Sequence, residues 1–277
     1  VFGAFYYLNH NLPSVEKLRE YTEEIPLRIY SRDGHLIAQI GARKRSPIDY
    51  DEIPDIVRNA FLAAEDDRFF DHPGYDYQGL IRAALYMLKT GTRAQGGSTI
   101  TMQLTRACCL TRDKSLLRKG KEIILAFKIE NEFSKEQILE LYLNTIFLGQ
   151  RAYGIVAAAN VYFGKTLDEL TVAEAATLAG IPPSPNKYNP VRSRQKATER
   201  RAYALRRMHE LEFIDDEQLA AAITTPMISR EHGPRIDLRA PYIAEMVRAK
   251  MIDLFDDNAT TGGYQVITTI DSTLQRA

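Results

Sequence analysis

The amino-acid sequence predicts a mainly α-helical protein with a short β element at each end. Between residues 54 and 255, apolar residues recur at helical spacing and are bounded by helix-capping and helix-ending residues. Strand-like segments occur at 27–40 and 263–271. At 277 residues, of which 45% are hydrophobic and 26% charged, the chain is long enough for one large core or two small ones.

Only one of the two β elements has an evident pairing partner next to it in the sequence. Residues 27–40 have apolar residues on both sides of Asp33-Gly34, a strong turn dipeptide, and are expected to form a hairpin. Residues 263–271 are expected to form a strand that has little chain after it to pair with. This indicates a fragment of a longer protein.

Helix signals dominate the chain between these elements. Pro54 precedes a helix at 55–65, and two capping boxes begin at Ser134 and Thr171, whose helices end near Asn144 and before Gly180. Further helices are predicted at 76–89, 98–109, 115–131, 153–163, 193–212, 215–223 and 241–255. Residues 90–97 are expected to form a mobile loop, and the proline-rich residues 182–190 a rigid, extended one.

Charge and cysteine content exclude some classes of protein. Lys+Arg and Asp+Glu are equal at 36 each, so no global field attracts nucleic acid, and we expect no nucleic-acid partner. A local cluster does exist, because residues 106–121 contain six basic residues and one acid. Cys108 and Cys109 are adjacent, and since neighbouring cysteines rarely reach disulfide geometry without strain, we predict two free thiols.

The first eight residues are apolar and aromatic, but a membrane-spanning helix needs about 20 such residues. They are either the trimmed end of a membrane anchor or a disordered or locally packed terminus.

Glu65 is the first candidate for chemistry. It closes the apolar helix at 55–65, where the negative end of the helix dipole should raise its pKa. A carboxylate with a raised pKa suits a general base. The alternative is a solvated, charged helix end followed by a turn.

Glu122 shares one stripe of its helix with Arg118, while apolar residues occupy both faces. A covered Glu–Arg pair belongs in a cleft or a buried ion pair. The alternative is an ordinary exposed bridge between residues four apart, worth a few tenths of a kcal/mol.

The segment 96–106 is predicted to be a loop that leads into a helix, with Ser98 or Thr99 as its cap. Helix N-termini bind anions, and Arg106, Lys114 and Arg118 follow closely enough to neutralise a diphosphate. The alternative is a capped helix with a basic, solvated face.

No sequence pattern indicates a protein-ligated zinc, an α/β-hydrolase triad or a nucleotide-binding P-loop. The S-x-x-K at Ser184–Lys187, which would suit a penicillin-reactive serine, lies between prolines instead of opening a helix. His72 has no partner at ligand spacing and is expected to stabilise a turn.

Taken in order, five groups of residues resemble the five motifs of the family 51 glycosyltransferases, the polymerase module of class A penicillin-binding proteins and of monofunctional peptidoglycan glycosyltransferases. The matching residues are Glu65, Asp66, Arg68, Phe69, His72 and Gly74 for the first motif, 96–101 with Gln103 for the second, Arg118, Lys119 and Glu122 for the third, 135–144 with Gly149 for the fourth, and 174–180 with 182–190 for the fifth. The similarity covers about 45–215, and five motifs in order make it specific.

The resemblance implies an architecture. The fold would be a lysozyme-like helical glycosyltransferase lobe with a smaller, membrane-proximal jaw. The implied division of the chain is 1–8 as the remnant of a transmembrane anchor, 9–44 as linker and hairpin, 45–225 as the glycosyltransferase domain with its jaw at about 75–115, and 226–277 as the route toward a transpeptidase domain that is not in this sequence.

The resemblance also implies an activity. Such enzymes polymerise lipid II by inverting displacement of undecaprenyl diphosphate, which makes a β-1,4 glycan strand. Glu65 would be the base, and Glu122 would orient Arg118 and a divalent metal, Mg²⁺ or Mn²⁺, held mainly through the substrate diphosphate; its alternative role is that of an acid. The implied substrate-binding residues are Asp66, Ser98, Thr99, Gln103, Arg106, Lys114, Arg118 and Lys187.

The implied partners are lipid II, the growing glycan chain, the membrane lipid surface and other proteins of cell-wall synthesis, on the periplasmic side of a bacterial inner membrane. Two alternatives stay open. One is a glycan-cleaving enzyme of lysozyme-like fold, and the other is a non-catalytic module that binds cell wall or membrane. The basic run after Gly97 argues against the first, because hydrolysis of a neutral glycosidic bond needs no diphosphate clamp.

Overall fold

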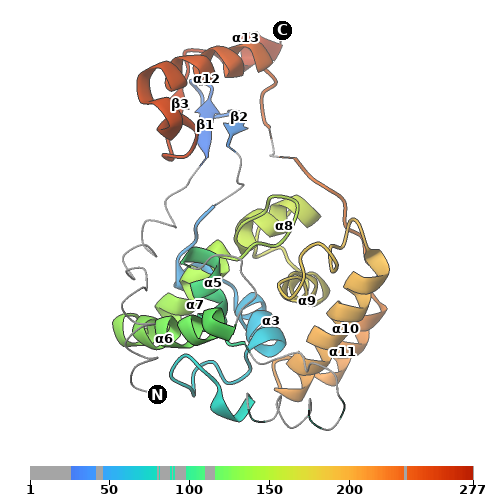
Figure 1. The fold of residues 1–277 in the computed structure, drawn as a ribbon. Helices are drawn as coiled ribbons and strands as arrows, with labels where there is room; N and C mark the ends of the chain where they lie inside the picture. Colours follow the sequence, from blue (N-terminus) through green and yellow to red (C-terminus); the bar gives the residue numbers. More distant parts are fainter. Residues whose placement is uncertain are drawn as a thin grey trace.

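The computed structural model describes residues 26–41, 46–79, 81, 88, 90, 98–109, 116–233 and 236–276, and it is mainly helical, as the sequence predicts. Figure 1 shows most helices gathered in one lobe, with a small sheet and the C-terminal helices set apart from it. The described part of the lobe consists of η1 (Tyr50–Glu52), α3 (Asp55–Glu65), α5 (Ile100–Cys108), α6 (Leu116–Glu132), α7 (Lys135–Thr145), α8 (Ile155–Phe163), α9 (Val172–Ala179), α10 (Arg194–Glu210) and α11 (Asp216–Thr224).

Side chains fix the first turns of several lobe helices. Ser134 and Thr171 each accept a hydrogen bond from the backbone amide three residues on, and the side chains of Gln137 and Glu174 accept one in return. Both predicted capping boxes are therefore confirmed. The same arrangement opens α11.

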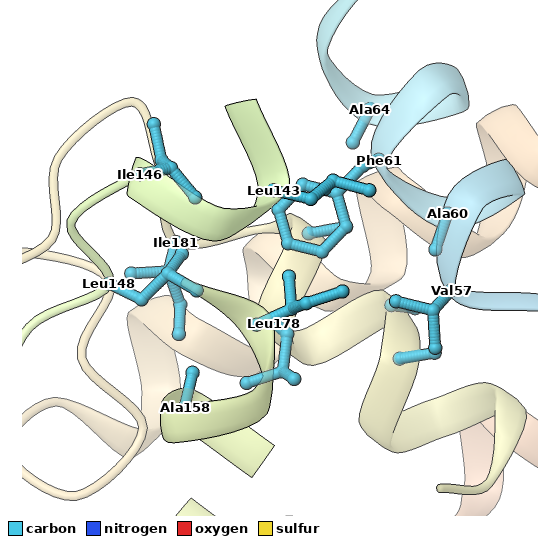
Figure 2. Close-up of a cluster of buried hydrophobic side chains, with 14 of the residues drawn as sticks. Val57, Ala60, Phe61, Ala64, Leu143, Ile146, Leu148, Ala158, Leu178 and Ile181 are labelled. Carbon is cyan, nitrogen blue, oxygen red and sulfur yellow. The ribbon is translucent and has the colours of Figure 1, made fainter. Parts of the chain in front are cut away.

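Helix α3 lies at the centre of the lobe's core. Its Val57 and Phe61 are fully buried, and Figure 2 shows them clustered with Leu143 of α7 and Leu178 of α9. Complete burial of a side chain of this size contributes about 1.5–3 kcal/mol. The core therefore fixes the position of α3, and with it the position of Glu65 at the end of that helix.

The proline-rich loop at 182–190 is folded into consecutive turns, whereas the sequence predicted an extended segment. The backbone amides of Lys187 and Tyr188 both donate to Ser184 O at 2.9 Å. The Asn189 side chain accepts hydrogen bonds at 3.0 Å from the amides two and three residues on. Proline excludes helix and inner strand but is well suited to turns, so the prediction was right about the excluded elements and wrong about the conformation.

The two predicted β elements join in one sheet. β1 (Leu27–Tyr30) and β2 (Leu36–Ile40) pair antiparallel around the Asp33-Gly34 turn, as predicted, and Gly34 has the positive φ of +85° that such a turn requires. β3 (Gln265–Ile267) pairs parallel to β1, which gives the order β2-β1-β3. The sequence predicted no partner for this strand, because its partner lies at the opposite end of the chain.

A second, smaller core lies beside this sheet. Leu27, Ile29 and Ile37 of the hairpin pack with Leu238 and Met251 from the C-terminal part of the chain. The remaining elements of this unit are α12 (Pro241–Phe255), η2 (Asp256–Thr260) and α13 (Ser272–Arg276). The hairpin and the C-terminal segment therefore fold together.

Several expectations fall outside the described residues. They concern the apolar segment 1–8, most of the predicted helix at 76–89, the loop at 91–97 and much of the predicted jaw at 75–115. In the part of the chain that the structure describes, no helix combines the length and the apolar character needed to cross a membrane.

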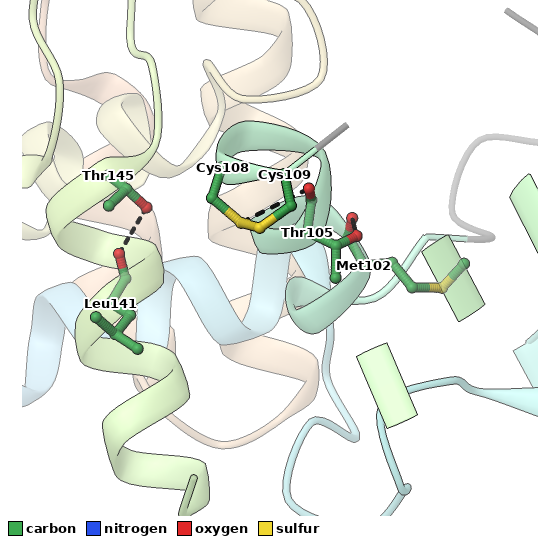
Figure 3. Close-up of a disulfide and its surroundings, with 6 residues drawn as sticks. All are labelled: Met102, Thr105, Cys108, Cys109, Leu141 and Thr145. Carbon is green, nitrogen blue, oxygen red and sulfur yellow. Dashed lines mark hydrogen bonds between the residues drawn. A yellow bond between two sulfur atoms is a disulfide. The ribbon is translucent and has the colours of Figure 1, made fainter. Parts of the chain in front are cut away.

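Cys108 and Cys109, predicted to be free thiols, form a disulfide with each other at the end of α5 (Figure 3). Cys108 is the last helical residue, and Cys109 follows with a non-helical backbone at φ −128° and ψ −10°. The prediction was wrong because the helix ends between the two residues, and this change in backbone direction brings their side chains together.

Candidate active site

The Glu65 carboxylate lies inside the lobe, not at a solvated helix end. Its side chain is only 7% exposed. Burial disfavours the charged form of a carboxyl group and raises the pKa of Glu65 from 4.5 to about 7. The sequence predicted the direction of this shift, but its main cause is burial, which the helix-dipole argument did not include.

A chain of hydrogen bonds orients Glu65. The Tyr142 hydroxyl of α7 donates to Gln103 Oε1 at 3.3 Å, and Gln103 Nε2 of α5 donates to Glu65 Oε2 at 2.7 Å. Because Tyr142 occupies the amide oxygen of Gln103, the amide nitrogen faces Glu65. The other carboxylate oxygen, Glu65 Oε1, makes no hydrogen bond with any described residue and is free to take a proton.

Glu122 of α6 is completely buried and surrounded by cations. Arg118, one turn earlier, donates a hydrogen bond to Glu122 Oε1. Arg106 Nε of α5 lies 3.8 Å from the same oxygen, and Lys119 Nζ lies 3.3 Å from Glu122 Oε2. The Arg–Glu pair is thus part of a larger cluster around a buried carboxylate, not an exposed bridge. Three positive charges around one negative charge leave a surplus that suits an anion.

Arg106 acts on both carboxylates. It lies one turn after Gln103 on α5, and its charge opposes the upward shift of the Glu65 pKa while it also pairs with Glu122. Its side chain is 41% exposed, so it can reach a ligand as well. Helix α5 therefore couples the two halves of the candidate site.

Asp66 and Thr99, predicted substrate-binding residues, make bonds within the protein. Asp66 accepts a hydrogen bond from the Ile100 amide at 2.9 Å, and His72 Nε2 lies 2.9 Å from its carboxylate. Thr99 caps α5 and donates to Gly74 O at 2.7 Å. Together they tie the loop after α3 to the start of α5, and His72 has the turn-stabilising role predicted for it. A direct contact of either residue with substrate stays a prediction.

Three further residues were predicted to bind substrate, namely Ser98, Lys187 and Lys114. Ser98 lies beside the cation cluster, since its Oγ accepts a hydrogen bond from Lys119 Nζ at 2.8 Å. Lys187 lies over the Tyr188 ring, with Nζ 5.1 Å from the ring centroid, in the loop between α9 and α10. Lys114 lies outside the described residues.

Two side chains of the site were missed by sequence reasoning, namely Tyr142 and Arg200. Tyr142 occupies an apolar position of its helix and resembles an ordinary core residue. Arg200 Nη2 lies 3.6 Å from Glu65 Oε1. No sequence signal marked it, because α10 is rich in arginine along its whole length.

A cavity of about 410 Å³ lies elsewhere, between the hairpin strands and α8. Its lining includes Arg28, Gln39, Asn160 and Lys165, and none of the predicted site residues. We therefore place the candidate site at the two glutamates and not at this cavity.

The residues around Glu122 do not fit a divalent metal held by the protein. Mg²⁺ and similar hard cations take several oxygen ligands. Glu122 is the single carboxylate of the cluster and is already paired with cations. Within the described residues, no three His, Cys, Asp or Glu side chains converge on one point. This set of groups favours an anion.

The chain is similar to known proteins. Residues 33–209 match the family model described as transglycosylase. The chain is 48% identical over 275 residues to penicillin-binding protein 1A of Pseudomonas aeruginosa and 44% identical over 277 residues to that of Escherichia coli K12. These matches cover 99% and 100% of this chain, but it spans only about a third of the length of these relatives, 34% and 33%.

A solved structure is also similar. Penicillin-binding protein 1A from Haemophilus influenzae superimposes with a TM-score of 0.50 at 31% sequence identity. The match covers 91% of this chain and 28% of that one.

Proposed function

The chain belongs to the transglycosylase family, and on that premise we propose that it polymerises lipid II into β-1,4 glycan strands by displacing undecaprenyl diphosphate with inversion. One observation carries the proposal. A buried carboxylate with a pKa of about 7 and one unbonded oxygen is coupled through α5 to a cluster of surplus positive charge.

Glu65 is the general base of the proposed reaction. The 4-hydroxyl oxygen of the acceptor sugar attacks C1 of the donor sugar, and its proton passes to Glu65 Oε1. The hydrogen bond from Gln103 holds the other oxygen, so the free one has a fixed direction. A pKa near the working pH leaves a substantial share of the base ionised and keeps it able to accept a proton.

The cation cluster stabilises the leaving group. As the bond between C1 and the diphosphate oxygen breaks, the electron pair stays on the diphosphate, and Arg106, Arg118 and Lys119 are placed to neutralise it. Glu122 holds these cations together against their mutual repulsion. We favour this role over proton donation, because a diphosphate is already a good leaving group.

A divalent metal, Mg²⁺ or Mn²⁺, enters this proposal with the substrate. The diphosphate oxygens supply the hard ligands that the described residues lack. When bound, the metal adds positive charge on the leaving-group side.

We further propose that the protein works at the outer face of the bacterial inner membrane, with lipid II and the growing glycan as substrates and other cell-wall synthesis proteins as partners. The lipid tail of the donor requires a nearby membrane. Exposed apolar side chains in the sequence segment that follows α3 support this placement, among them Phe70, Tyr77, Ile81 and Leu88.

The test compares two substrates. Purified protein with Mg²⁺ should convert lipid II into polymer and leave preformed glycan intact. A protein that shortens preformed glycan and does not consume lipid II is a glycan-cleaving enzyme, and the proposal is then wrong. A protein that binds lipid II without turnover is a binding module.

A further inference from the structure

We propose that Arg200 of α10 is a positioning residue for the base: it holds Glu65 in its ionised, proton-accepting form and directs Oε1 toward the acceptor hydroxyl. This inference rests on the proposed function and adds to it a residue outside the five motifs. Arg200 lies 10 positions after Pro190, the last residue of the fifth motif.

Arg200 lies close enough to attract the Glu65 carboxylate but too far away to form a hydrogen bond with its free oxygen. Arg200 Nη2 lies 3.6 Å from Glu65 Oε1, which is close enough for strong attraction and longer than a hydrogen bond. The two side chains are only 12% and 7% exposed, so water screens this attraction weakly. The oxygen therefore keeps its capacity to accept a proton.

Both partners have an unused polar atom. Glu65 Oε1 accepts no hydrogen bond and Arg200 Nε donates none among the described residues, and both atoms are buried. A hydroxyl group donates one hydrogen bond and accepts others. The acceptor sugar's hydroxyl therefore matches this pair, because it can donate to Glu65 while it accepts from Arg200.

The fold holds the Arg200 guanidinium in place. It lies over the Tyr203 ring at 4.2 Å from the centroid and faces Tyr188 at 5.9 Å. Gly180, at the end of α9, leaves room for the arginine stem, because a Cβ at this position would lie 3.0 Å from Arg200 Cγ. A planar cation that stacks on aromatic rings is held in one orientation.

The electrostatics around Glu65 agree with this role. The polar and titratable groups that face Glu65 are Gln103 and Arg106 from α5, Tyr142 from α7, Arg200 from α10 and the adjacent Asp66. Burial raises the pKa of Glu65, and Arg200 is the largest of the charges that oppose this rise. Loss of its charge should therefore move the pKa of Glu65 above about 7.

The experiment measures lipid II polymerisation against pH for the wild type, Arg200→Gln and Arg200→Lys. Arg206→Gln, an exposed arginine on the same helix, is the matched control. We expect the acidic limb to move up by about one pH unit or more in Arg200→Gln, with activity recovering at alkaline pH. Arg200→Lys should keep the limb near that of the wild type, and the control should not change it.

A second readout does not depend on turnover. Glutamate labelled with ¹³C at the side-chain carboxyl, assigned with Glu65→Gln, reports the titration of Glu65 directly in each variant. If Arg200→Gln does not fold, Gly180→Ala displaces the arginine stem at a position with an ordinary helical backbone, φ −77°, and should raise the Glu65 titration in the same direction.

Rate losses that are equal at every pH, together with an unmoved carboxyl titration, would show that Arg200 has only a structural role and overturn the proposal. A wild type that never consumes lipid II refutes the proposed function instead, and the carboxyl titration still decides the coupling between Arg200 and Glu65.

Discussion

Replacing Glu65 by glutamine should abolish turnover and yet stabilise the fold at alkaline pH. Raising the pKa of a carboxyl group from 4.5 to about 7 means that its ionised form costs the folded state about 3 kcal/mol. The wild type therefore has its full stability below pH 4.5 and loses about 3 kcal/mol of it as the pH rises to about 7. Glutamine has the same shape, stays neutral and can keep the hydrogen bond from Gln103.

The assay is thermal unfolding of both proteins between pH 4 and pH 8.5, followed by circular dichroism. At pH 8.5 the Tm of Glu65→Gln should exceed that of the wild type by roughly 6–12 °C, and the two values should converge near pH 4. Glu132→Gln, at an exposed position, is the control and should show little difference. A gain that is absent, or that is the same at every pH, would refute the view that burial of an ionisable Glu65 sets its pKa.

Three further predictions concern other residues of the lobe. Tyr142→Phe removes the bond that orients Gln103 and should lower kcat about fivefold, or about 1 kcal/mol, with the KM for lipid II unchanged in steady-state assays. Glu122→Gln leaves like charges facing one another and should cost about 2 kcal/mol in urea unfolding; inorganic pyrophosphate should recover more stability in this variant than in the wild type, and equal recovery would count against an anion site. Iodoacetamide should label Cys108 and Cys109 only after reduction, as read by mass spectrometry, and labelling without a reductant would contradict the disulfide.

Local sequence signals were sufficient to predict many helices of the lobe. The predicted helix at 55–65 matches α3, because proline before it and the apolar stripe within it both act over a few residues. The capping boxes at Ser134 and Thr171 were visible for the same reason. The sequence also singled out both glutamates as candidates, because ordered motifs lie around them.

Features that depend on distant contacts were not predictable in this way. The partner of β3 lies at the other end of the chain, and the charge beside Glu65 comes from α10, more than a hundred residues later in the sequence. Helical periodicity also could not decide whether Glu122 forms an exposed bridge or belongs to a cluster. One of the cations that complete the cluster, Arg106, comes from another helix, α5. In each case the missing information was which residues from other elements come into contact.

The division of labour between the carboxylates follows from their different surroundings. Glu65 has a free oxygen and a pKa of about 7, whereas both oxygens of Glu122 face cations. An amide cannot accept the proton, so Glu65→Gln removes the base completely. Glu122→Gln removes only the charge that holds the cations together, and the cations themselves remain.

The most direct test is the initial rate of lipid II polymerisation at saturating Mg²⁺ for the wild type, Glu65→Gln and Glu122→Gln. General base catalysis contributes about 10²–10⁴-fold, so Glu65→Gln should lose at least a hundredfold in rate, and Glu122→Gln clearly less. Equal losses across the metal range, or a Glu65→Gln variant that still polymerises lipid II at close to the wild-type rate, would contradict the assignment of Glu65 as the base.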